Sequence, residues 1–86
     1  NSQHAKAEAV DFECVGVDNA EVADWVNKNL ETDQLILEFY TPGEPNSGWI
    51  HASYVEFQPR AQYLRAYKEE GKTKYKPITG RAVDLV

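Results

Sequence analysis

The sequence predicts a small α+β domain in which a mainly antiparallel sheet packs against one helix. Two runs rich in β-branched and aromatic residues, 34–40 and 49–55, flank a loop dense in turn formers. An amphipathic segment with helical spacing precedes them, and a shorter alternating region follows. With 86 residues the chain should form one domain, near the lower size at which a single core is adequate without cross-links.

Composition excludes some kinds of partner. The formal net charge of -5 argues against a nucleic-acid partner, because phosphates would repel an acidic surface. We expect no membrane span, since the sequence contains no apolar run of the required length, and no leader segment opens it. The chain itself therefore carries no signal for its localisation.

The first predicted elements are a strand and a helix. Alternation over residues 8–17 predicts a strand whose apolar face includes Cys14, with its thiol buried. Asp18 is a suitable N-cap for a helix that should run to about residue 29. The expected buried stripe of this helix consists of Val22, Ala23, Trp25, Val26 and Leu30.

A hairpin is the simplest connection between the two apolar runs. The first run, 34–40, is apolar on both sides except for Glu38, as expected of an interior strand. The second run, 49–55, contains His51. If the strands pair symmetrically about the loop 41–48, paired positions sum to 89, which places Glu38 opposite His51 on one sheet face.

The C-terminal third is predicted to form a second hairpin. Residues 60–78 alternate around a turn at 69–71, and a helix over residues 60–68 is the alternative. Lysines in this region are typical of exposed edge strands. Residues 79–86 are expected to be a peripheral tail.

A zinc site is predicted from the histidines and one carboxylate. His4 and Asp11 lie seven positions apart, which on a straight strand means opposite faces and roughly 23 Å. A bend over residues 5–8 would bring them together. With His51, the remaining histidine, they provide two nitrogens and one carboxylate, a ligand set that leaves zinc a fourth position for water. A hydrogen-bonded histidine and a capping aspartate in a metal-free domain are the alternative.

Four sequence blocks occur together in a characteristic order. They are Ser2-x-His4, Ala9-x-Asp11, Asp33-Gln34-Leu35-Ile36-Leu37-Glu38-Phe39 and Trp49-Ile50-His51-x-Ser53-Tyr54. They resemble the zinc D-Ala-D-Ala carboxypeptidases and their phage endolysin relatives, which have the hedgehog-like DD-peptidase fold. The match covers residues 2–55, with a weaker likeness to Pro77.

This resemblance implies a function, a cofactor and a location. Zn2+ would be bound by His4, Asp11 and His51, and the whole chain, residues 1–86, would be a single zinc peptidase-like domain. Its substrate would be a peptidoglycan stem peptide, cut as a carboxypeptidase or as a cell-wall endopeptidase. The cell wall or periplasm is the implied location, and the source is bacterial or phage.

The chain departs from the family pattern at its N-terminal end. Ala7 stands where the family usually has glycine in the bend between histidine and aspartate. The family's domain normally begins well upstream, with a Ser-Gly-Tyr-Arg block whose arginine helps to hold substrate. We therefore expect the chain to be the C-terminal portion of a longer domain, a processed product or a trimmed relative.

Glu38 is the predicted general base of the hydrolysis, because it is the lone carboxylate in an apolar strand. Several relatives have an acidic residue three positions before the final histidine, where this chain has Gly48. Glu44, in the loop, is the second candidate. The alternative for Glu38 is a buried carboxylate paired with a lysine or arginine.

Two further function classes stay open. One is a catalytically silent zinc module that binds cell-wall peptide or a protein partner. The other is a cysteine hydrolase that uses Cys14 as its nucleophile and a histidine as base. Sensitivity to thiol alkylation and indifference to chelators would mark the cysteine enzyme, and the zinc peptidase should show the reverse.

Overall fold

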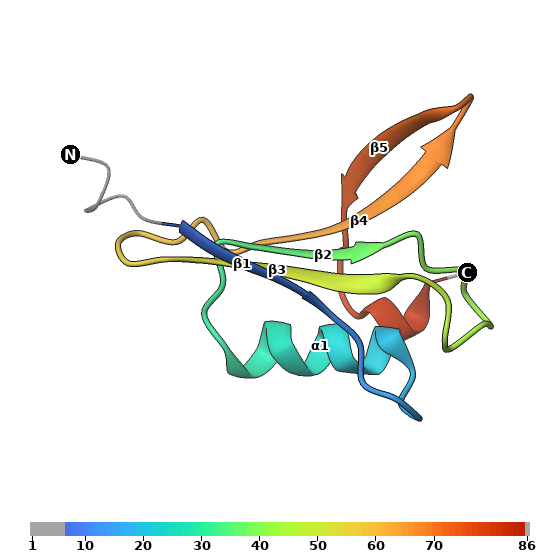
Figure 1. Cartoon of the computed structure of the whole chain (residues 1–86), viewed down its shortest axis with the longest axis horizontal. Helices are drawn as coiled ribbons and strands as arrows, with labels where there is room; N and C mark the ends of the chain where they lie inside the picture. The colour runs from blue at the N-terminus through green and yellow to red at the C-terminus, as the bar shows by residue number, and fades with distance from the viewer. Residues whose placement is uncertain (1–6, 86) are drawn as a thin grey trace.

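One helix packs against one face of a five-stranded mixed sheet (Figure 1). The structure is a computed structural model that describes residues 7–85. Its elements are β1 (Ala7–Phe12), α1 (Asn19–Asn29), β2 (Gln34–Glu38), β3 (Trp49–Val55), β4 (Gln62–Glu69), β5 (Lys72–Pro77) and the 3-10 helix η2 (Ala82–Asp84). The strand order is β1-β3-β2-β4-β5. The predicted α+β class, with a mainly antiparallel sheet and a packed helix, is confirmed.

The helix α1 begins where the sequence predicts. The Asp18 carboxylate caps it by accepting a hydrogen bond of 2.9 Å from the amide of Ala20. The buried cluster between α1 and the sheet consists of Ala20, Val22, Ala23, Val26, Leu35, Leu37, Ile50, Ala52, Tyr63, Ile78 and Ala82. The predicted burial of Trp25 and Leu30 is wrong, because they are 59% and 44% exposed on the flank and end of the helix.

The first strand is shorter than predicted. It ends at Phe12, and the chain then turns into α1, with Gly16 at a φ of 83° and the amide of Val17 bonded to the carbonyl of Cys14. Cys14 is exposed, so the predicted burial of its thiol is wrong. The alternation beyond Phe12 was misleading because the chain has to leave the sheet here to reach the helix.

The hairpin of β2 and β3 is confirmed, but its register differs from the prediction. Glu38 pairs with Trp49, and His51 pairs with Ile36, so paired positions sum to 87 rather than 89. The strand β2 ends at Glu38 because Phe39 adopts a φ of 55°. A shift of two residues keeps each side chain on its face, and Glu38 and His51 therefore still share one face of the sheet.

The strands β4 and β5 form the second predicted hairpin. They turn at Glu70 and Gly71, which have φ values of 53° and 78°. The alternative of a helix over residues 60–68 is wrong, since β4 begins at residue 62. Figure 1 shows the distal part of this hairpin rising from the sheet on the side away from α1.

The pairing of β4 with β2 is parallel, which the sequence did not predict. Asp33, directly before β2, fixes it: its backbone carbonyl accepts from the amide of Gln62 at 3.0 Å. Its carboxylate also accepts hydrogen bonds from the Arg60 amide and Nε, both at 2.9 Å, and from Nη2 at 2.6 Å. One residue thus joins the start of β2 to the segment that leads into β4.

The stability of the fold should fall in acid because of Asp33. Hydrogen bonds from Arg60 lower the pKa of the Asp33 carboxyl to about 2, below its value of about 3.9 in the unfolded chain. The ionised form therefore stabilises the fold above about pH 4, and this contribution is lost as the pH falls towards about 2. Thermal unfolding between pH 2 and 5 should show a steeper dependence on pH in the wild type than in Asp33→Asn. Equal slopes in the two proteins would contradict this role.

The C-terminal residues are integral to the fold, so the predicted peripheral tail is wrong. Ile78 and Ala82 belong to the buried cluster, with exposures of 8% and 1%. The Asp24 carboxylate of α1 accepts hydrogen bonds from the Tyr63 hydroxyl and the Ala82 amide, both at 2.7 Å. Burial, together with this bond to Asp24, raises the pKa of Tyr63. The contacts attach η2 and β4 to the helix.

No helix in residues 7–85 has the length and apolar character that a membrane crossing requires.

Candidate functional site

The face of the sheet opposite α1, here called the open face, gathers the polar side chains that bear on function. The observed registers place Asp11, Ile36, Glu38, Trp49, His51 and Ala66 on it. Alternation puts their neighbours on the α1 side, where Leu35, Leu37, Ile50 and Ala52 belong to the core. Within residues 7–85 no helix covers this face, and the β4–β5 hairpin rises beside it (Figure 1).

Asp11 and His51 form a hydrogen-bonded pair across neighbouring strands. They are directly opposite each other in the β1–β3 register, and Nδ1 of His51 lies 2.7 Å from Oδ1 of Asp11. Because an ionised carboxylate only accepts, Nδ1 is the donor in this pair, and Nε2 is the ring nitrogen that could bind a metal. The side chains of His51 and Asp11 are 27% and 63% exposed, so ligands can reach them.

Glu38 is held at the end of β2 by the indole of Trp49. Nε1 of Trp49 donates a hydrogen bond of 2.9 Å to Oε2 of Glu38, across the pair that the register sets. Among residues 7–85 no lysine or arginine forms an ion pair with Glu38. The alternative of a carboxylate paired with a basic side chain is therefore wrong for this part of the chain.

These three residues converge on one point of the open face. One donor atom from each of Asp11, Glu38 and His51 lies within 4.8 Å of the others. Two carboxylates and an imidazole are oxygen and nitrogen ligands that suit a divalent cation. Glu44, the other candidate base, is exposed in the loop and is not part of this group.

The donor set fits zinc after small side-chain movements. Tetrahedral zinc with bonds of about 2.0–2.2 Å needs neighbouring donors about 3.3–3.5 Å apart. One ligand atom from each of the three side chains lies within 4.8 Å of the others, so a zinc ion would draw them closer together. The 2.7 Å contact between Nδ1 of His51 and Oδ1 of Asp11 is a hydrogen bond and is not counted as a spacing between ligand atoms. Asp11 is exposed and Glu38 is half-buried, so their rotamers can adjust.

The third predicted ligand, His4, lies outside the described residues. Ala7 and Glu8 already belong to β1, where they pair with Val55 and Tyr54. The part of the predicted bend that falls on these two residues is therefore wrong. Ligation by His4 stays a prediction.

Gly48 is a structural determinant of the site that sequence reasoning did not identify. Its φ is 66°, and a Cβ at this position would lie 2.0 Å from the carbonyl oxygen of Glu38 and 2.8 Å from the carbonyl carbon of Phe39. A side chain at this position would therefore meet the backbone at the end of β2, next to Glu38. The side-chain amide of Asn19 donates hydrogen bonds to the carbonyls of Ser47 and Gly48 at 2.9 and 3.2 Å. These bonds help to hold the backbone of Gly48 close to the end of β2.

Phe39 lies on the open face because of its backbone conformation. Regular alternation after Glu38 would turn its side chain towards α1, but the φ of 55° interrupts the strand. Its ring centroid is 5.5 Å from that of Trp49, and Nζ of Lys68 is 5.8 Å from it. A bulky residue in the left-handed region is uncommon and costs about 1–2 kcal/mol.

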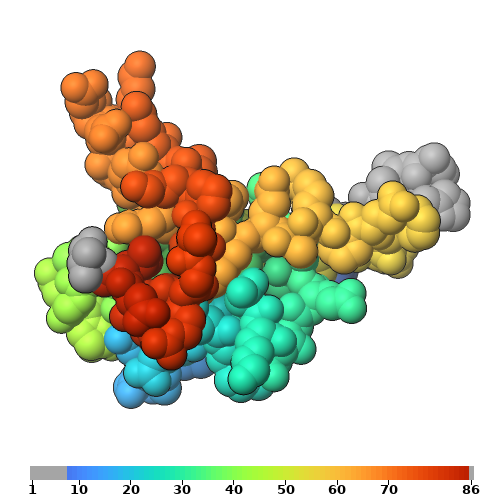
Figure 2. All heavy atoms as spheres, turned by 180° about the vertical axis from the view of Figure 1, so that it is seen from behind, coloured from blue at the N-terminus to red at the C-terminus, as the bar shows by residue number. Residues whose placement is uncertain are grey.

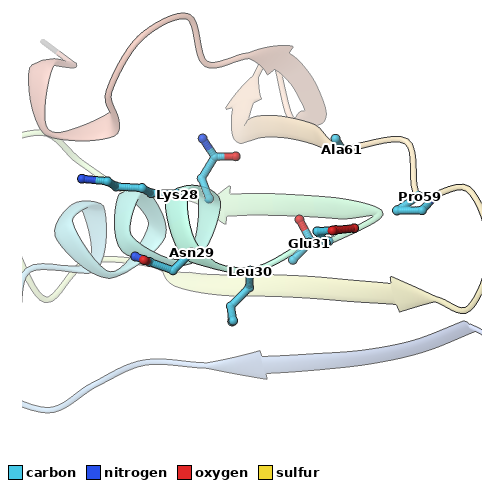
Figure 3. Close-up of a pocket in the computed structure, with 8 residues that line it drawn as sticks. Lys28, Asn29, Leu30, Glu31, Pro59 and Ala61 are labelled. Atoms are coloured by element: carbon cyan, nitrogen blue, oxygen red, sulfur yellow. The ribbon is translucent and has the colours of Figure 1, made fainter.

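A hollow elsewhere on the molecule lacks a combination of carboxylates and an imidazole like that of the open face. Figure 3 shows it at the end of α1, where it is bounded by the segment before β4. Its volume is about 390 Å³, and its lining residues are Asn27, Lys28, Asn29, Leu30, Glu31, Thr32, Pro59 and Ala61. Only one acidic and one basic side chain line it, so the open face is the better candidate for chemistry.

Comparisons with known proteins identify no relative: no protein-family model, curated protein or solved structure matches this chain. The functional assignment therefore depends on Asp11, Glu38 and His51 and on the sequence blocks that contain them.

Proposed function

We propose that the chain is a zinc-dependent peptidase that hydrolyses a peptide bond in peptidoglycan stem peptides. The observation that carries the metal site is the convergence of Asp11, Glu38 and His51 on an accessible sheet face. The substrate class rests on the resemblance of the sequence blocks to the zinc D-Ala-D-Ala carboxypeptidases and endolysins, since a fold alone does not specify a substrate.

In this proposal Asp11 and His51 hold the metal together with His4. Zinc in such a site supplies Lewis acidity, which acidifies a water molecule and polarises an amide carbonyl. The indole N–H of Trp49 keeps the Glu38 carboxylate beside the other two donors. Because Asp11 and His51 lie on adjacent strands of one sheet, their relative position is set by the backbone register rather than by a loop.

Glu38 acts as the general base and then as the general acid. It accepts a proton from the water whose oxygen bonds to the substrate carbonyl carbon, and it later returns that proton to the amide nitrogen as the carbon–nitrogen bond breaks. The products are a carboxylic acid and an amine, so no further reactant is needed. The open face gives an extended peptide access to these groups.

One zinc ion per chain is the expected result of metal analysis on protein purified without chelator. His51→Ala should remove most of the bound metal, because it eliminates the nitrogen donor of the described group. Chelation should also lower the melting temperature of the wild type, since an ion that binds only the folded state stabilises it by mass action. Full zinc occupancy in His51→Ala would exclude His51 as a ligand.

Incubation with purified peptidoglycan, followed by mass spectrometry of released peptides and D-alanine, tests the activity. Zinc-dependent release of D-alanine or of cleaved stem peptides is expected. Zinc binding with no cleavage would favour the silent module that binds cell-wall peptide or a protein partner. Activity that survives chelation but is lost on alkylation of Cys14 would instead indicate a cysteine enzyme.

A further inference from the structure

Lys68 is a basic residue of β4 that lies on the same face of the sheet as the candidate site. Among the strand residues that the structure describes, it is the one cationic side chain that the registers place on the open face. Arg65 and the three lysines of β5 lie on the other face of the hairpin, because Arg65 pairs with Lys76 and Glu69 with Lys72. The position of Lys68 therefore differs from that of every other strand cation in residues 7–85.

The charge of Lys68 is available to a ligand. It is exposed, and among residues 7–85 no carboxylate forms an ion pair with it. By contrast, Lys74 on the opposite face is paired with Glu69 at 3.1 Å. The ammonium of Lys68 lies over the ring of Phe39, and this cation–π contact holds the side chain towards the site.

The surroundings of Lys68 connect it to Glu38 through aromatic contacts. Phe39, which Lys68 covers, touches the Trp49 ring, and Trp49 donates its hydrogen bond to Glu38. The Cα atoms of Glu38 and Lys68 are about 8 Å apart by strand spacing, since Ala66 pairs with Glu38 and Lys68 lies two residues further on. An extended peptide residue spans about 3.5 Å, so a group one or two residues from a bond at Glu38 can reach Lys68.

We propose that Lys68, Phe39 and Trp49 form a subsite that binds a carboxylate of the peptide substrate beside the hydrolytic centre. The inference rests on the proposed function for the identity of the peptide. Lys68 would pair with the carboxylate, and the two rings would cover the adjacent backbone. The left-handed conformation of Phe39 has a role in this arrangement, because without it the ring that supports Lys68 would turn towards α1. Figure 2 shows the β4–β5 hairpin, which carries Lys68, projecting from the body of the molecule.

Binding can be separated from turnover by titrating zinc-loaded protein that carries Glu38→Gln and Trp25→Phe. Trp49 is then the remaining tryptophan, and its fluorescence reports on the subsite directly. Three peptides serve as probes: diacetyl-Lys-D-Ala-D-Ala, its C-terminal amide, and an amide of the same length with glutamate in place of the lysine. The acid should bind about fivefold more tightly than the first amide, the upper range for an exposed ion pair.

Variants of Lys68 then test the assignment. Lys68→Met should abolish the preference and Lys68→Arg should keep it, while Lys72→Met, on the other face of the same hairpin, should leave it unchanged. If the acid alone binds more tightly than the first amide, the carboxylate is terminal. If the glutamate amide alone binds more tightly than the first amide, the carboxylate comes from a side chain. Equal binding of all three peptides, no binding at all, or a preference that survives Lys68→Met would overturn the subsite.

The same measurements keep this inference separate from the proposed function. A Lys68-dependent carboxylate preference in a protein that cleaves no peptide would support the subsite and refute the hydrolase. Zinc-dependent cleavage that is unaffected by Lys68→Met and by amidation of the substrate would support the hydrolase and refute the subsite.

Discussion

Glu38→Gln is expected to lower the rate of peptide hydrolysis about a hundredfold or more, the loss typical of removing a general base. Glutamine preserves the size of the side chain and can still accept the hydrogen bond from Trp49. The fold and the zinc content should therefore be retained. The measurement is the initial rate on a stem peptide, combined with metal analysis and thermal unfolding of the same preparation.

Glu44→Gln is the matched control, because Glu44 is an exposed carboxylate of the loop that connects β2 to β3. It should change the rate little. Full activity in Glu38→Gln would eliminate the general-base role. Loss of zinc in that variant would instead identify Glu38 as a ligand or as support for the ligands, consistent with its place in the group of three donors.

Gly48→Ala is expected to destabilise the fold strongly. An alanine at a φ of 66° is strained by about 1–2 kcal/mol, and forcing a methyl group into a filled space typically adds about 1–3 kcal/mol. The new Cβ would meet backbone atoms of Glu38 and Phe39, which cannot rotate away as a side chain could. A total of about 3 kcal/mol lowers the melting temperature of a domain of this size by roughly 12–24 °C.

Gly43→Ala separates the strain of a positive φ from the steric contact of the new methyl group with the backbone. Gly43 also has a positive φ, 91°, but a Cβ there would have no atom within 4 Å. Gly43→Ala should introduce only the backbone strain. Its melting temperature should therefore fall clearly less than that of Gly48→Ala. Similar stabilities for the two variants would mean that the close approach of Gly48 to β2 contributes little. In that case an acidic side chain at position 48 would not be excluded by space.

Local patterns in the sequence determined several elements of this protein. The N-cap at Asp18, the helix after it and the hairpin turn at Glu70 and Gly71 are each specified within a few residues. Turn formers between two apolar runs likewise predicted the β2–β3 hairpin. Alternation in those runs was enough to place Glu38 and His51 on one face. Side chains alternate between the two faces of a strand, so a register shift of two residues leaves each side chain on the same face.

Long-range contacts decided what these patterns could not. The parallel pairing of β2 with β4 depends on Asp33 and Arg60, which are 27 positions apart, and no local signal specifies such a contact. The register of the hairpin, in which Glu38 pairs with Trp49, is accompanied by a close approach of the Gly48 backbone to Glu38 that the local sequence did not predict. Burial also depends on tertiary packing, which is why Cys14 and Trp25 are exposed although their apolar surroundings predicted otherwise.

The candidate site was likewise predicted in part from the sequence and decided in part by the tertiary structure. The sequence predicted His4, Asp11 and His51 as zinc ligands from the two histidines, a carboxylate and the family-like blocks, and it predicted Glu38 as the base because it is the lone carboxylate in an apolar strand. Of these residues, the structure brings Asp11, Glu38 and His51 together. Their convergence required the observed order of β1, β3 and β2, which brings three separate segments together. Lys68 gave no such signal, since lysines on an edge hairpin are ordinary, and only the pairing of β4 with β2 places it on the open face beside Glu38.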